Sequence, residues 1–145
     1  MAESLNIYKP FMRTLLNKEV DLDSDDIRVM LVGGAYTPDA SAHAYKADVT
    51  GEITGTNYTA GGEAIPGKSF TITDGTGIFS ADNVMWPALT ADTDIRYGVI
   101  YDNTPATDDI KPLIAYIDFG EAIPVPNADF EVIWSTAGIL RVTAV

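Results

Sequence analysis

IRYGVIYDNTPATDDIKPLIAYIDFG, residues 95–120, is the stretch of sequence that decides the fold. Two apolar runs, residues 95–101 and 113–119, flank a polar segment that contains Asp, Asn, Thr and Pro. Side chains of a β-strand point alternately to opposite faces, so each run predicts a strand that is buried on at least one face. The turn-forming residues between the runs predict a long antiparallel hairpin in the middle of a sheet.

The same alternation predicts which side chains share a face of the hairpin. In the first run, one face is expected to carry Ile95, Tyr97, Val99 and Tyr101. In the second run, one face is expected to carry Leu113, Ala115, Ile117 and Phe119. No side chain in the hairpin has the character of a reactive group.

Short apolar segments separated by turn signals continue on both sides of the hairpin. They predict strands over residues 27–32, 68–73, 76–80, 83–86, 130–134 and 139–143. Asp74-Gly75 predicts a tight hairpin turn, and Pro87 is expected to end the strand before it. About eight short strands without a βαβ rhythm predict a mainly β chain, an antiparallel β-sandwich or jelly roll.

The N-terminal 17 residues are expected to form an arm and the only real helix of a single domain, residues 1–145. Residues 1–7 are predicted to be a short arm. Apolar residues spaced i, i+3, i+4, i+7 and i+8 predict a helix over about residues 8–17. A helix this short is marginal in water, so its apolar face should dock on the sheet or on another subunit. Residues 35–56 are predicted to form a long polar excursion.

Composition excludes several classes of function. The chain of 145 residues is 46% hydrophobic, which suits one domain with a full core. Its 21 acidic and 9 basic residues give a net charge of −12, and the basic residues are scattered, which argues against a nucleic-acid partner. It has no cysteine for disulfides or thiolate metal sites. We find no secretory signal and no apolar run of membrane-spanning length, so we expect no export and no membrane partner.

Residues 62–69, GEAIPGKS, match the phosphate-binding loop pattern GxxxxGK[ST]. That site requires a loop that opens a helix, whose N-terminal N–H groups bind the phosphates. Here the residues after Lys68 alternate as a strand, and Pro66 removes one N–H donor. We therefore interpret the segment as a turn that leads into a strand, and a nucleotide-using enzyme is the alternative.

Two further patterns each contain part of a functional site, one of a calcium-binding loop and one of a hydrolytic centre, and both lack required residues. Asp21, Asp23 and Asp25 begin like a calcium-binding loop, but the glycine and glutamate that such a loop requires at later positions are missing. His43 is the only histidine, and no activated nucleophile accompanies it, so we expect a histidine in a surface loop. We expect no catalytic, cofactor-binding or metal-binding residues.

The two tryptophans raise the possibility of a carbohydrate-binding adhesion module. Trp134 shares a face with Phe130 and Val132 on a predicted strand, which favours packing in the core. Trp86 stands at a predicted strand end, where either core packing or stacking on a sugar ring is open.

Several strings of this sequence occur in an order that resembles a family of small structural proteins from tailed bacteriophages. They are IRVMLV (27–32), YTPD (36–39), GTNYTAGG (55–62), FSADNVMW (79–86), RYGVIYDNT (96–104), LIAYIDFG (113–120) and FEVIWSTAGIL (130–140). The resemblance implies a non-enzymatic virion component: a head decoration, or cement, protein with a jelly-roll fold, often trimeric. It implies binding to the major capsid protein on the capsid exterior, after assembly in the host cytoplasm. A tail or head–tail connector protein is the alternative within the family.

A cement protein clamps neighbouring capsid subunits, and binding only the assembled state stabilises that state. It therefore needs a rigid β body and segments that reach across subunits, for which residues 1–17 and 35–56 are the candidates. The residues expected at a capsid or subunit interface are Tyr8, Phe11, Met12, Leu15, Tyr36, His43 and Tyr45.

Overall fold

The computed structural model describes residues 4–145. This part of the chain contains eleven β-strands, one α-helix and two short 3₁₀ helices. Strands hold 46% of the residues and helices 9%, so the prediction of a mainly β chain is confirmed. The elements are β1 (Ser4–Ile7), α1 (Pro10–Leu16), β2 (Ile27–Gly33), η1 (Lys46–Asp48), β3 (Gly55–Thr56), β4 (Glu63–Ala64), β5 (Ser69–Thr73), β6 (Thr76–Ser80), β7 (Val84–Ala91), β8 (Ile95–Asp102), η2 (Asp108–Ile110), β9 (Leu113–Ile123), β10 (Pro126–Val132) and β11 (Leu140–Thr143).

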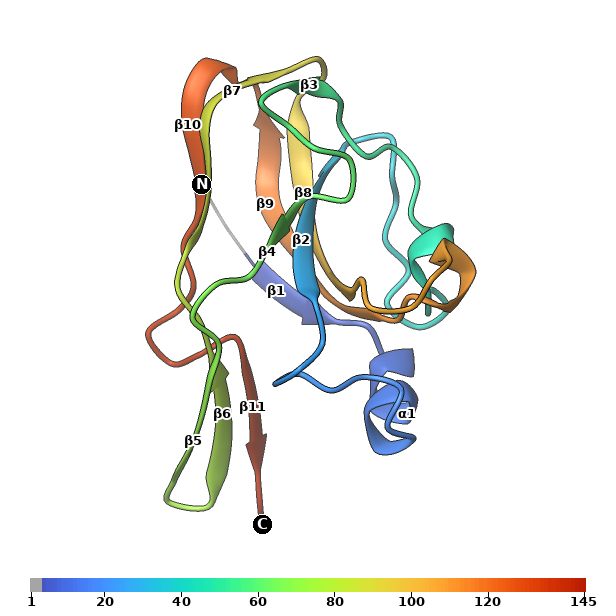
Figure 1. The fold of residues 1–145 in the computed structure, drawn as a ribbon, viewed down its shortest axis with the longest axis vertical. Helices are drawn as coiled ribbons and strands as arrows, with labels where there is room; N and C mark the ends of the chain where they lie inside the picture. The colour runs from blue at the N-terminus through green and yellow to red at the C-terminus, as the bar shows by residue number, and fades with distance from the viewer. Residues whose placement is uncertain (1–3) are drawn as a thin grey trace.

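The strands form three antiparallel sheets (Figure 1). The largest has the order β1-β9-β8-β2-β4, and the smaller two have the orders β10-β7-β3 and β11-β6-β5. β8 and β9 pair with Gly98 opposite Ile117, and β8 is the middle strand of its sheet. The predicted central hairpin is therefore confirmed.

Irregularities in the register of this hairpin correct the predicted faces. The pairing of β8 with β9 shifts near both ends of β8. An extra residue in one strand turns the side chains beyond it to the opposite face. Ile95 consequently packs in the same core cluster as Ile100, and Leu113 lies in a different cluster from Ala115.

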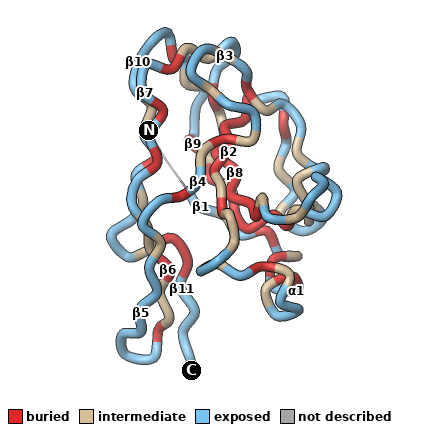
Figure 2. Tube along the Cα trace, in the orientation of Figure 1, coloured by how far each residue is buried: buried red, intermediate tan, exposed pale blue. Residues whose placement is uncertain are grey.

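The five-stranded sheet is buried on both faces, as Figure 2 shows along β2 and β8. On one face it packs against the sheet β10-β7-β3, around Trp86 and Leu89. On the other face it carries a second cluster, with Val99 and Tyr101, that Tyr36 and Val49 of the long excursion help to cover. Burial on both faces explains why β2 reads as a nearly continuous apolar run.

The N-terminal segment differs from its prediction. Ser4–Ile7 form β1, an edge strand paired with β9, instead of an arm. Residues 1–3 of the predicted arm lie outside the described residues. The helix α1 starts at Pro10 and not near Tyr8, because the Tyr8 N–H still donates to the Ile114 carbonyl of β9 (3.1 Å).

β7 continues beyond Pro87 to Ala91, although proline was expected to end it. The register of β7 with β10 skips residues at this point, which marks a bulge. Ala88 has φ 48°, and its N–H donates to the Asp129 carboxylate (2.9 Å) instead of to a strand carbonyl. The bulge accommodates a proline, which has no N–H to contribute to the ladder.

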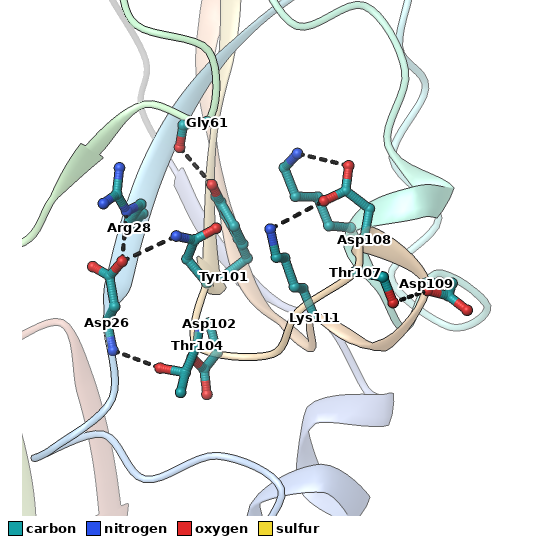
Figure 3. Close-up of polar contacts among 12 residues, drawn as sticks. Asp26, Arg28, Gly61, Tyr101, Asp102, Thr104, Thr107, Asp108, Asp109 and Lys111 are labelled. Carbon is teal, nitrogen blue, oxygen red and sulfur yellow. Dashed lines mark hydrogen bonds and ion pairs between the residues drawn. The ribbon is translucent and has the colours of Figure 1, made fainter.

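A polar network ties the start of β2 to the loop after β8 (Figure 3). The Asp26 carboxylate accepts hydrogen bonds from Arg28 (2.8 Å) and Asn103 (3.0 Å), and the Asp26 N–H donates to the Thr104 hydroxyl (2.8 Å). Nearby, the Tyr101 hydroxyl donates to the Gly61 carbonyl (2.5 Å). These bonds hold three separate loops against one end of the sheet.

Asp102 is a buried carboxyl group beside this network. Its Oδ1 accepts the Thr104 N–H (2.9 Å), and its Oδ2 has no hydrogen-bond partner among the described residues. Burial, together with the neighbouring Asp25 carboxyl group, raises the pKa of Asp102 to about 6. Compared with the unfolded chain, the folded chain therefore favours the protonated form of Asp102.

We predict that Asp102→Asn stabilises the protein at neutral pH. An acid whose pKa is raised on folding contributes stability at low pH, and this contribution is lost as the pH rises from the ordinary value of 3.8 to about 6. Asparagine keeps an uncharged side chain there at every pH, so the free energy of unfolding should rise by on the order of 1–3 kcal/mol at pH ~7.5. Below pH ~4 the gain should vanish.

Urea unfolding of wild type and variant at both pH values measures this difference. Asp94→Asn, at an exposed aspartate, is the control and should change the free energy of unfolding little at either pH. A variant that is less stable than wild type at neutral pH would contradict the assignment of a raised pKa.

Candidate functional site

An apolar cleft of about 700 Å³ lies between α1 and the three-stranded sheet β5-β6-β11, at the end of the molecule where the chain terminates (Figure 1). One wall comes mainly from the N-terminal segment and the other from the sheet. Its lining contains no acidic side chain, and its only charged residue is Arg141. Its large apolar lining residues include Ile7, Phe11, Met12, Leu15, Leu16, Phe70, Ile72, Phe79, Leu140 and Val142.

Strand register produces the apolar face of the sheet wall. Phe79 of β6 lies opposite both Phe70 of β5 and Leu140 of β11, and the Phe70 and Phe79 rings stack with centroids 5.1 Å apart. Two residues further on, Ile72 and Val142 flank Gly77 in the same way. The intervening positions of β5 carry serine and threonine, and those of β11 carry arginine and threonine. The second face of the sheet is therefore mainly polar, with Ile78 of β6 as an apolar exception.

The β5–β6 hairpin has the turn that its sequence predicts. Asp74 and Gly75 have φ values of 50° and 76°, the conformation that a two-residue type I′ turn requires. The turn fixes the register between Phe70 and Phe79 and therefore the composition of the apolar face.

Much of the cleft lining is exposed to solvent, as Figure 2 shows at the outer ends of β5 and β11. The exposed fractions are 81% for Ile72, 68% for Val142 and 87% for Leu16, and Met12 and Phe70 are close to half exposed. Contiguous apolar surface of this kind marks an interaction site in soluble proteins. The arrangement can hold an apolar surface of another macromolecule, and it offers no group for bond chemistry.

The structure divides the predicted interface residues between two places. Phe11, Met12 and Leu15 line the cleft, with Phe11 itself buried. Tyr8 and Tyr36 are buried in the cluster on the covered face of the large sheet, remote from solvent. The prediction thus located one wall of the cleft and missed the opposite wall on β5 and β11.

Tyr8, Tyr36 and His43 form a hydrogen-bonded chain within the molecule. The Asp39 N–H donates to His43 Nδ1 (3.2 Å), so this nitrogen is an acceptor. The Tyr36 hydroxyl consequently donates to His43 Nδ1 (2.7 Å) and accepts from the Tyr8 hydroxyl (3.0 Å). Burial raises the pKa of Tyr36 to about 12, which keeps its hydroxyl neutral at physiological pH.

Tyr45 makes a second connection between the excursion and the N-terminal segment. Its hydroxyl accepts from Arg13 (3.1 Å) and donates to Glu19 (3.2 Å), and the Lys9 N–H donates to the Ala40 carbonyl (2.7 Å). The two segments expected to reach toward other subunits are therefore bound to each other within residues 4–145.

The motifs singled out in the sequence occupy structural roles. Ser69–Thr73 form strand β5, so the helix that a phosphate-binding loop requires is not found after Lys68. The Lys68 ammonium donates to the Asp25 carbonyl (2.6 Å), and the Asp21 carboxylate accepts N–H groups of its own turn. No group of three or more His, Cys, Asp or Glu residues that could hold a metal ion occurs within residues 4–145.

Both tryptophans pack against the main core, as was predicted for Trp134 and left open for Trp86. Trp86 is only 1% exposed and packs between the two sheets, so a sugar ring has no access to it. Trp134 lies beyond β10, packs on the edge of the same cluster while remaining partly exposed, and donates its indole N–H to the Asp82 carbonyl (2.9 Å). The carbohydrate alternative thereby loses the residue on which it depended.

Comparison of the chain with family models, with curated proteins and with solved structures finds no match. Within the described part of the chain, no helix has the length and apolar composition needed to cross a membrane.

We predict that Tyr36→Phe destabilises the protein. Loss of this hydroxyl leaves the buried Tyr8 hydroxyl and His43 Nδ1 without their shared partner, and an unsatisfied buried group costs about 1–3 kcal/mol. Urea unfolding measures the loss. Tyr97→Phe is the control, because Tyr97 packs in the same aromatic cluster but stands outside the hydrogen-bonded chain. If the two variants had the same free energy of unfolding, the hydrogen bonds between Tyr8, Tyr36 and His43 would contribute nothing to stability.

Proposed function

We propose that the chain is a non-enzymatic structural protein of a tailed-phage virion, a head decoration protein that binds and stabilises the shell of the major capsid protein. The proposal includes a position on the capsid exterior and a homotrimeric form, which the sequence resemblance implies. It also includes the finer architecture: the packing of the sheet β10-β7-β3 on the five-stranded sheet is compatible with a β-sandwich or jelly roll.

The apolar cleft is the observation that carries the proposal. A protein that joins a preformed lattice keeps an apolar contact surface uncovered until its partner is present, and this chain keeps Ile72, Val142 and Leu16 exposed. Binding of the assembled shell, but not of free subunits, would stabilise the shell by mass action.

The charge of the chain supports the same function. A net charge of −12 keeps free molecules soluble at high local concentration in spite of the exposed apolar surface. It also opposes contact with DNA, which suits a position outside the shell. The apolar cleft has no acidic residue, so contact there does not require acids to be desolvated.

Co-sedimentation of the full chain with closed shells of the cognate major capsid protein tests the function. We expect the chain to bind closed shells, to ignore unassembled subunits and to raise the temperature at which shells dissociate. Averaged particle images should show its density repeated over the whole lattice. Density confined to one vertex or to the tail would favour the connector alternative, and absence of binding to closed shells would refute the proposal.

We predict that Ile72→Asp lowers shell occupancy at least about tenfold, since a charge buried in an apolar contact costs well over the 1.4 kcal/mol that a factor of ten represents. Ile72 is 81% exposed, so the substitution should leave the fold intact. Thr73→Asp places the same charge on the polar face of the same strand, outside the cleft lining, and serves as the matched control. Equal occupancy of the two variants would exclude the cleft from shell binding.

A further inference from the structure

We propose that Asp102 and Asp25 bind a calcium ion between the connector that follows α1 and the loop that follows β8. The connector is residues 17–26, and the loop is residues 103–107. The inference goes beyond the proposed function and does not depend on it. It assigns to the chain a cation site that two segments far apart in the sequence form together.

A buried carboxylate oxygen without a partner carries the proposal. The Asp102 side chain is fully buried, with 0% exposed. Its Oδ1 accepts the Thr104 N–H (2.9 Å), and its Oδ2 has no hydrogen-bond partner among the described residues. A buried polar atom that loses its hydration without gaining a contact is destabilising, and such atoms are rare in folded proteins. A bound cation would supply the missing contact.

The carboxyl group of Asp25 lies beside that of Asp102, within hydrogen-bonding reach. Its Oδ2 accepts the Asp21 N–H (2.8 Å), which leaves Oδ1 for another contact. Carboxylates are acceptors only and repel one another, so two that meet need a cation or a shared proton between them. A cation would satisfy both groups at once, and the calcium dependence of stability distinguishes it from a proton.

No basic side chain within residues 4–145 forms an ion pair with Asp25 or Asp102. The adjacent acid, Asp26, is paired with Arg28 (2.8 Å). The Lys68 ammonium donates to the backbone carbonyl of Asp25 (2.6 Å) and forms no ion pair with its carboxylate. The two facing carboxylates therefore have no counter-ion of their own, which is the electrostatic condition for binding a divalent cation.

The ligand chemistry of the site favours calcium. Its protein ligands are all oxygens, since the Thr104 hydroxyl also lies beside Asp102 at the end of β8 (Figure 3). Thr104 is exposed and Asp25 is partly exposed, so water can enter and complete the coordination. Calcium accepts six to eight oxygens in irregular arrangements, whereas magnesium requires a near-ideal octahedron. Two carboxylates are few for such a site, so we expect a dissociation constant on the order of 0.1–1 mM.

The site differs from the calcium-binding loop that the sequence pattern of Asp21, Asp23 and Asp25 suggests. The Asp21 carboxylate accepts the N–H groups of Asp23 and Ser24 within its own turn. Asp25 instead faces a residue of the central sheet. The site contains two acids, which agrees with the absence of a metal-binding group of three or more among residues 4–145.

Calcium bound at this site would fasten the connector to the sheet. The connector joins α1 to β2, and the Asp26 N–H already attaches it to the Thr104 hydroxyl (2.8 Å). A ligand that binds only the folded chain stabilises it by mass action. At about 10 mM calcium and pH ~7.5, the temperature of unfolding should therefore rise by roughly 3–10 °C.

Thermal unfolding of the full chain, followed by circular dichroism with a chelator or with calcium at constant ionic strength, tests the inference. We expect the rise in wild type and its loss in both Asp102→Asn and Asp25→Asn. Asp23→Asn removes the same charge from an exposed position of the same connector and should keep the rise. Magnesium at the same concentration should give a smaller rise.

Isothermal titration with calcium chloride provides a second measurement. It should show one site per chain in wild type and in Asp23→Asn, and none in Asp102→Asn. Asp102→Asn is expected to be the more stable protein in the chelator, so loss of its calcium response would not reflect unfolding. A wild-type chain that does not respond to calcium would overturn the inference. A response that Asp102→Asn and Asp25→Asn retain would place calcium elsewhere on the acidic surface, and an equal response to magnesium would overturn the choice of ion.

Discussion

Burial of the five-stranded sheet on both faces is the constraint on which the rest of the structure depends. One face is covered by a second sheet, and the other by a segment with little regular structure, residues 34–49. Such a segment must satisfy its backbone groups without a strand ladder, and here it does so with other backbone groups and with side chains. Asp39 and Asp48 accept N–H groups along it, and Tyr36 fixes it to Tyr8. The polar excursion is thus a cover, and its hydrogen bonds keep it in place.

The third sheet, β11-β6-β5, also has an apolar face that needs to be covered, but the chain covers only part of it. Its base closes the end of the main core through Phe79 and Leu140, whereas Ile72 and Val142 at its tip remain largely uncovered by the described residues. Because the alternation of β5 and β11 does not change along the strands, the tip is as apolar as the base. The cleft is the space that this continuity leaves between the sheet and α1.

Local patterns in the sequence predicted those elements whose signal lies within a few residues: the central hairpin, β2 and the Asp74-Gly75 turn. The two-residue strands β3 and β4 have no such signal, since they exist only through pairing with distant strands. The bulge beside Pro87 depends in the same way on Asp129. For the site, helical spacing identified one wall of the cleft. The other wall required knowing that β5 and β11 lie against a helix more than 50 residues earlier in the chain.

The two apolar regions outside the main core are closed to different degrees. The cover of residues 34–49 is held by hydrogen bonds within the molecule, so Tyr8 and Tyr36 are buried by the chain itself. The cleft has no such cover among the described residues, and Ile72, Val142 and Leu16 stay exposed. Contact at the cleft would therefore bury apolar side chains without displacing any folded segment, whereas contact with Tyr8 or Tyr36 would first require the hydrogen bonds of the cover to break.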